Sequence, residues 1–184
     1  ANSIRAAHRG EFELARHLLN KVAELAKEMS RASVTHPAVY YAGYVEDAQK
    51  EYVEANATLA FAEDTNLKSP EELHIGAAPY MNGLAETVGE MRRLILDSLR
   101  KNSLTRCEEL LGIMDEVYSI LITMDFPDAI TRGLRRNTDV ARGILERTRG
   151  DLTLAIRQKR LEKQLHTFEQ NLSSNKNNDT PSNK

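Results

Sequence analysis

The chain has 184 residues, of which 41% are hydrophobic and 28% are charged, and it contains 9 glycines, 5 prolines and no tryptophan. These values are ordinary for a globular chain, and the low glycine and proline content favours helices over turn-rich β structure. The net charge of -2 argues against a surface coated in basic residues, although a local basic cluster could still bind nucleic acid.

A single cysteine, Cys107, excludes an intrachain disulfide framework and a cysteine-rich zinc site. No apolar stretch approaches the roughly 20 residues that a membrane span needs, and the N-terminus lacks a signal-peptide pattern. We therefore expect a soluble, cytoplasmic protein that does not contact a membrane.

Apolar residues recur at steps of three and four along most of the chain, which predicts helices. Gly10 is expected to end a first helix, His36-Pro37 a second, and Ser69-Pro70 to begin a short one. We expect the chain to begin inside the first helix. The longer predicted helices cover residues 1–10, 11–31, 38–63 (with Tyr41 on its apolar stripe), 79–101, 103–122 and 129–168.

No segment shows sustained two-residue alternation, so the sequence predicts an all-α bundle of about six or seven helices. Ser, Asn, Lys, Asp and Pro dominate the end of the chain. We expect one helical domain over residues 1–168 and a disordered tail over 169–184.

Two pairs of acids lie at helical spacing, Glu51 with Glu54 and Glu86 with Glu90. Each pair places like charges on one helix face, which is unfavourable unless a cation offsets the repulsion. If the two helices pack together, four carboxylates converge and provide the oxygen ligands that magnesium or manganese prefers. Two solvated helix faces, with Glu90 and Arg93 as an ordinary ion pair, would explain the same spacing.

Other chemistries have less support. A di-iron bundle requires Glu-x-x-His motifs, and none of the five histidines has that spacing. The glycine-rich fingerprints of nucleotide-binding loops are also missing. Basic residues cluster at Arg5, His8 and Arg9, which suggests contact with a nucleic-acid backbone.

Several strings resemble the translin family, and specifically its Trax-like branch, which includes archaeal members. The segment 4–11, Ile-Arg-Ala-Ala-His-Arg-Gly-Glu, resembles the end of the family's first long helix. Residues 51–55, Glu-Tyr-Val-Glu-Ala, are similar to the Trax helix that supplies two catalytic glutamates, and residues 83–93 resemble the run that supplies two further acids and an arginine. Glu86 stands where Trax has aspartate.

The resemblance implies a hollow homo-oligomer, such as an octamer, that binds single-stranded RNA or DNA on its inner surface. It also implies a magnesium-dependent endoribonuclease with Glu51, Glu54, Glu86 and Glu90 as catalytic and metal-binding residues. Arg5, His8, Arg9 and Arg93 are the expected nucleic-acid contacts. Two alternatives remain open: a non-catalytic single-strand-binding protein like translin, and an all-α nucleotide pyrophosphohydrolase, which also uses a Glu-x-x-Glu element.

Overall fold

The computed structural model describes residues 1–36, 38 and 43–178. In this part of the chain the regular secondary structure is entirely helical, with six longer helices and two of four residues, as the sequence predicts for an all-α bundle. The helices are α1 (Asn2–His8), α2 (Phe12–Thr35), α4 (Tyr44–Glu63), α5 (Pro70–Leu73), α6 (Ala77–Arg100), α7 (Leu104–Ile122), α8 (Asp128–Thr131) and α9 (Leu134–Asn178).

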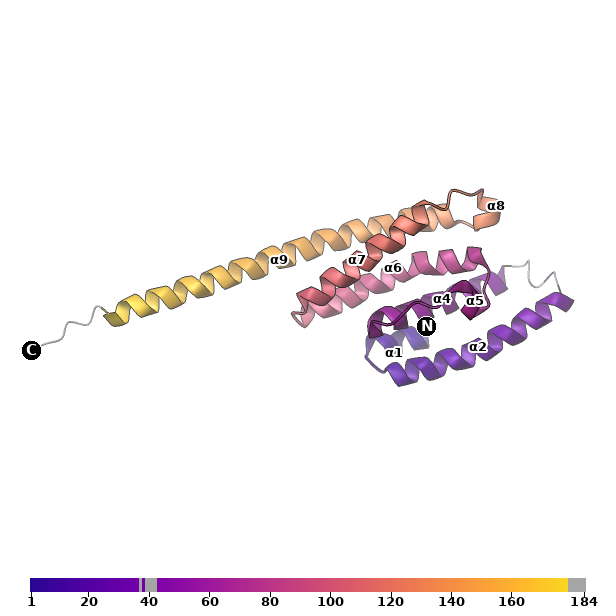
Figure 1. Cartoon of the computed structure of the whole chain (residues 1–184), viewed down its shortest axis with the longest axis horizontal. Coiled ribbons are helices and arrows are strands. Elements are labelled where there is room, and N and C mark those ends of the chain that lie inside the picture. Colours follow the sequence, from indigo (N-terminus) through magenta and orange to yellow (C-terminus); the bar gives the residue numbers. More distant parts are fainter. Residues whose placement is uncertain (37, 39–42, 179–184) are drawn as a thin grey trace, which may run out of the picture.

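Helix α6 lies at the centre of the bundle and packs against α4 on one side and against α7 and α9 on the other (Figure 1). Its Val88, Met91 and Ile95 are fully buried, because apolar residues at steps of three and four form one continuous stripe. Helices α1 and α2 pack against each other and against α4. The site-bearing helices α4 and α6 are therefore held from both sides.

Several predicted helix ends are confirmed. Helix α1 ends at His8, and Gly10 follows with a φ of 75°, a conformation that glycine adopts without strain. Ser69 and Glu72 form a reciprocal capping box at the start of α5, with Pro70 as its first residue. Of the predicted 38–63 helix, α4 covers the part from Tyr44, while Tyr41 lies outside the described residues.

The predicted helix over 129–168 is wrong at its start, since it is divided into α8 and α9. Arg132 and Gly133 both have left-handed backbone conformations, with φ of 53° and 85°. Two such residues in succession cannot continue an α-helix, and the Gly133 N–H is instead bound by the Asp128 carboxylate at 2.9 Å. This turn allows α9 to fold back along α6 and α7.

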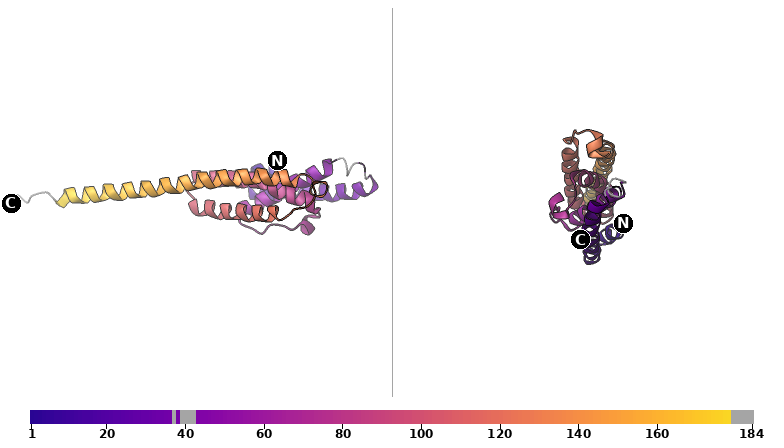
Figure 2. Two further views of the ribbon diagram at one scale, coloured as in Figure 1. Left: turned by 90° about the horizontal axis from the view of Figure 1, so that it is seen from above. Right: turned by 90° about the vertical axis from the view of Figure 1, so that its right-hand side faces the viewer.

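Helix α9 continues to Asn178, past Phe168 and into the segment for which the sequence predicts disorder. Extending an existing helix costs far less than nucleating one, which accounts for the extra turns. Figure 2 shows this part of α9 projecting well beyond the other helices. No helix among the described residues combines the length and the hydropathy needed to cross a membrane.

Candidate functional site

The site begins with an unusually close contact between α4 and α6 at Gly83. A Cβ atom at this position would lie 2.6 Å from the Lys50 carbonyl oxygen and 2.7 Å from the Val53 Cβ, so only glycine permits the approach. Glu51 and Glu54 flank this contact on α4, and Glu86 lies one turn after Gly83 on α6. The two predicted acid pairs are thus carried by helices in backbone contact.

Glu54 is the most perturbed of the four acids. Its side chain is half-buried, and burial raises its pKa to about 7, with further contributions from the negative charges of Glu86, Glu90 and Glu51. A pKa that responds to three other carboxylates requires them to lie nearby. The four predicted acids therefore lie close enough for the charges of Glu51, Glu86 and Glu90 to act on Glu54.

Glu86 is held by a lysine that the sequence pattern does not single out. Lys50 Nζ lies 3.0 Å from Glu86 Oε1 and 3.6 Å from Asp47 Oδ1. Burial lowers the pKa of Lys50, but the hydrogen bond to Glu86 and the charges of Glu86 and Asp47 outweigh it and raise this pKa overall. Lys50 is therefore a firmly charged cation at the edge of the acid cluster.

Glu90 is held by His8 from helix α1, through a hydrogen bond between His8 Nε2 and Glu90 Oε2. This hydrogen bond lowers the pKa of Glu90 despite partial burial, with smaller contributions from the charges of His8 and Arg93. The His8 side chain is only 2% exposed, and its Nδ1 is buried without a hydrogen-bond partner. Glu90 consequently stays ionised beside the buried ring of His8.

The predicted basic cluster is divided by this arrangement. Arg5 and Arg9 are exposed, as is Arg93 on α6, but His8 points into the protein toward Glu90. Helical spacing alone groups His8 with Arg5 and Arg9, because it carries no information on what packs against the helix. The structure places His8 beside the acid cluster instead of on the exposed basic surface.

A pocket of about 270 Å³ adjoins the acids and is lined by Glu54, Ala85, Glu86, Asn137, Val140 and Ile144. Its far wall belongs to α9, where Asn137 Nδ2 donates to Asn82 Oδ1 at 2.8 Å and Asn82 Nδ2 donates to the Thr131 carbonyl at 2.8 Å. These hydrogen bonds connect α6, the α8 turn and α9. The sequence alone does not reveal Asn137, since an isolated asparagine on a polar helix face has no distinguishing pattern.

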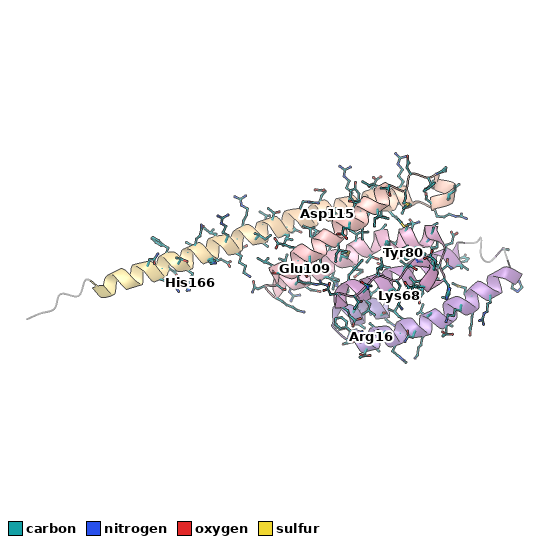
Figure 3. The ribbon with its side chains drawn as sticks, in the orientation of Figure 1. Arg16, Lys68, Tyr80, Glu109, Asp115 and His166 are labelled. Carbon is teal, nitrogen blue, oxygen red and sulfur yellow. The ribbon has the colours of Figure 1, made fainter. Side chains whose placement is uncertain are left out.

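The acid cluster fits a divalent cation in charge and in donor type. Glu51 and Glu54 form no hydrogen bond or ion pair with other described residues, and four carboxylates supply the hard oxygen donors that magnesium and manganese favour. Lys50 and His8 engage the other two acids, and in this conformation no three His, Cys, Asp or Glu side chains of the described residues are arranged to hold a metal ion. Binding would therefore require the side chains of Glu86 and Glu90 to turn. Figure 3 shows the side chains along the helices that carry this region.

Comparison with known proteins finds relatives that are similar to this chain in sequence and in fold. The uncharacterised protein MJ0175 of Methanocaldococcus jannaschii is 32% identical over 156 residues, which cover 84% of this chain and 68% of that protein. The structure of AfC3PO in complex with duplex RNA matches with a TM-score of 0.75 and 35% identity, over 84% of this chain and 80% of that one.

Apo-NeC3PO, at 21% identity and a TM-score of 0.75 over the same shares of the two chains, has the same fold. No family model matches the sequence. Because AfC3PO exceeds 30% identity over most of its length, the chain belongs to the translin/C3PO family.

Proposed function

We propose that the protein is a divalent-metal-dependent endoribonuclease that binds single-stranded RNA inside a hollow homo-oligomer, for example an octamer. The observation that carries this proposal is that the charges of Glu51, Glu86 and Glu90 all act on the half-buried Glu54 and, with burial, raise its pKa to about 7. Active sites are where burial and like charges shift a carboxyl pKa this far. The similarity to AfC3PO, solved with duplex RNA, supports RNA as the substrate class.

The chain's own residues have separate roles in this proposal. One of the four glutamates would orient or deprotonate the attacking water, and the half-buried Glu54, beside the charges of the other three, is the first candidate. His8 keeps Glu90 ionised before a cation binds, and the pocket beside Glu54 and Glu86 offers space for part of a nucleotide. Magnesium or manganese held by the four glutamates would stabilise charge on the phosphate and supply an activated water.

The exposed arginines are the proposed contacts with the RNA phosphates. Arg5, Arg9 and Arg93 carry positive charge at the surface of α1 and α6, and guanidinium groups bind phosphate through paired hydrogen bonds. His8 belongs to the same helix as Arg5 and contacts Glu90, so an RNA backbone bound along α1 would pass near the acids. The same surface could hold single-stranded DNA, which lacks the 2′-hydroxyl that distinguishes RNA.

The test is cleavage of labelled single-stranded RNA with magnesium, with manganese and with a chelator. Matched duplex RNA and single-stranded DNA define the substrate. Glu54→Gln and Glu86→Gln are expected to lose cleavage by at least about a hundredfold, while RNA affinity and assembly size stay unchanged. Glu116→Gln, an exposed glutamate on α7, is the matched control. Wild-type cleavage rates in both site variants would refute the assignment.

A non-catalytic RNA-binding role is the second candidate. The pairing of Lys50 with Glu86 and of His8 with Glu90 favours it, because both acids are already engaged by protein groups. Such a protein would bind RNA in a salt-sensitive manner and show no metal-dependent cleavage. Release of pyrophosphate from a nucleoside triphosphate with magnesium would instead indicate the pyrophosphohydrolase alternative.

A further inference from the structure

A second pocket lies on the α2 side of α4, whereas the acid cluster lies on the side that faces α6. It has a volume of about 140 Å³ and is formed by α2, α4 and the segment around α5. None of its residues belongs to the pocket beside Glu54. The residues that matter for its chemistry are Lys27, Gln49, Tyr52, Lys68, Leu73 and Ile75.

Gln49 gives the pocket an unmet need for a hydrogen-bond partner. This residue is only 5% exposed, and its Oε1 is buried without a partner among the described residues. Leaving such an acceptor unpaired is costly, so most buried polar groups in native proteins have a partner. Reversing the side-chain amide keeps the requirement, because the buried group would then be a donor without an acceptor. A ligand in the pocket can supply the missing partner.

The walls of the pocket are held in place by hydrogen bonds of their own. Tyr80 Oη donates to the Lys68 carbonyl at 2.7 Å, and the Ile75 N–H donates to the Pro70 carbonyl at 3.0 Å. The capping box at the start of α5 fixes the residues between them. Figure 3 labels Lys68 and Tyr80 in this region. The pocket is therefore preformed, which lowers the entropic cost of binding.

The volume and the lining of the pocket suit one flat six-membered ring. A cavity of about 150 Å³ holds one benzene molecule, which is close to the space available here. Tyr52, Leu73 and Ile75 are buried and offer one aromatic and two apolar side chains to the faces of such a ring. The edge of uracil or cytosine carries a donor beside an acceptor, which matches the amide of Gln49 in either orientation. A purine has a second ring, for which the volume leaves no room.

The lysines beside the pocket are available to an anionic group. Lys68 is exposed, and its ammonium group forms no ion pair with other described residues. Lys27 lies 3.0 Å from Glu24 in an exposed ion pair, which exchanges at little cost. The Glu72 carboxylate, also at the pocket, already accepts a hydrogen bond from the Ser69 N–H at 2.7 Å. A phosphate attached to the ring could therefore be bound by the two lysines.

We propose that this pocket binds a pyrimidine nucleotide, either free or at the end of an RNA strand. Gln49 pairs with the edge of the base, and Lys27 and Lys68 bind the phosphate. The proposal does not depend on RNA cleavage, because no residue of the acid cluster lines the pocket.

Calorimetric titration of the full chain with uridine monophosphate, in the presence of a chelator, tests the site. Cytidine monophosphate is expected to bind within a few-fold of it, and adenosine monophosphate and inorganic phosphate at least about tenfold more weakly. Equal affinity for adenosine monophosphate would overturn the assignment to a single ring. Equal affinity for inorganic phosphate, or no binding of millimolar uridine monophosphate, would also overturn the proposal.

Two variants separate loss of the ligand contact from loss of the fold. Gln49→Leu is expected to weaken the binding of uridine monophosphate at least about tenfold. It should nevertheless unfold at the same or a higher urea concentration than wild type, because it removes an unpaired buried oxygen. Lys68→Ala should weaken binding several-fold, with Lys163→Ala on α9 as the exposed control. Unchanged binding in Gln49→Leu would contradict the proposal.

Glu54→Gln distinguishes this site from the acid cluster. It should bind uridine monophosphate as the wild type does, even if it no longer cleaves RNA. Loss of nucleotide binding in Glu54→Gln would place the nucleotide at the acid cluster and overturn the assignment to the α2 side of α4.

A short RNA that ends in a uridine 3′-phosphate distinguishes the two sources of the nucleotide. Displacement of labelled uridine monophosphate by this RNA, but not by the same RNA ending in adenosine, would assign the pocket to RNA ends. No displacement by either RNA would assign it to free nucleotides. Equal displacement by both would mean that the terminal base does not enter the pocket, and the proposal would fail.

Discussion

Glu54 shows how a single carboxylate can make the stability of the protein depend on pH. Its pKa is about 7 in the folded protein and near 4.5 in an unfolded chain, so between these values the folded state holds a proton that the unfolded state has released. Stability is then highest below pH 4.5 and falls as the pH rises toward 7. The wild-type protein should accordingly be less stable at pH 8 than at pH 5 through this residue.

Replacing Glu54 with glutamine removes this dependence. Without metal, the free energy of unfolding of Glu54→Gln is expected to rise by about 1–2 kcal/mol relative to that of wild type when the pH is raised from 4.5 to 8. The expected difference is reduced because solvent partly screens the half-buried group. Urea unfolding of both proteins at several pH values measures the difference. An equal pH dependence for the two proteins would show that Glu54 titrates normally.

His8 makes the opposite contribution through Glu90. Removing its side chain in His8→Ala leaves a partly buried carboxylate without its hydrogen bond, which is expected to cost about 1–3 kcal/mol at pH 7. The cost should shrink in acid, as the pH falls through the lowered pKa of Glu90 and the carboxylate that His8 stabilises becomes protonated.

His8→Gln keeps a side-chain N–H donor and should retain more stability than His8→Ala. Chemical unfolding at pH 7 and pH 4 compares the two variants, with Arg9→Ala as the exposed neighbour that should change little. A destabilisation in Arg9→Ala as large as that in His8→Ala would assign the effect to helix α1 in general.

At the level of the elements, the contact between α4 and α6 determines where the acids lie. Gly83→Ala would force its new methyl group against the backbone of Lys50, so a destabilisation of about 1–3 kcal/mol is expected even though alanine is the better helix former. Gly89→Ala on the same helix is the control, since its nearest neighbour would be Ile144 Cδ1 at 3.9 Å.

Thermal unfolding of the two glycine variants separates packing from helix propensity. Gly89→Ala should be neutral or stabilised by up to about 1 kcal/mol. A Gly83→Ala protein as stable as Gly89→Ala would mean that the two helices can move apart without cost.

The helices themselves are predictable because local spacing determines them. Apolar steps of three and four residues locate α2, α6 and α7, and the Ser69-Pro70 signal locates α5. The break at Arg132 escapes such a prediction because a left-handed arginine has no local signature. The contacts of His8 with Glu90 and of Lys50 with Glu86 escape it because they depend on which helices become neighbours, and periodicity does not specify this.

At the level of the whole molecule, the charge is divided between two regions. Glu54 and Glu86 line the pocket formed with α9, whereas Arg5, Arg9 and Arg93 remain on the exposed surface of α1 and α6. A net charge of -2 therefore conceals a local positive surface next to a local negative one. Binding of a polyanion to such a surface should be strongly weakened by salt.

The combined variant Arg5→Ala and Arg9→Ala should weaken RNA binding. It should also reduce the slope of log affinity against log salt by about 0.7 for each phosphate that the variant no longer neutralises. Fluorescence anisotropy at several salt concentrations measures both quantities. Arg160→Ala with Lys163→Ala removes the same charge from the projecting part of α9, and an identical change in slope there would point to non-specific attraction.

The close approach of α4 and α6 at Gly83 has a consequence for how the protein can change over generations. Because the two helices touch through their backbones, the carboxylates cannot relieve their repulsion by a small separation of α4 and α6. Replacing one of the acids with a neutral residue removes the repulsion more easily. A laboratory selection for heat resistance alone, run in a chelator, should therefore replace Glu54 repeatedly while leaving Gly83 untouched, and a selection that includes metal should preserve both.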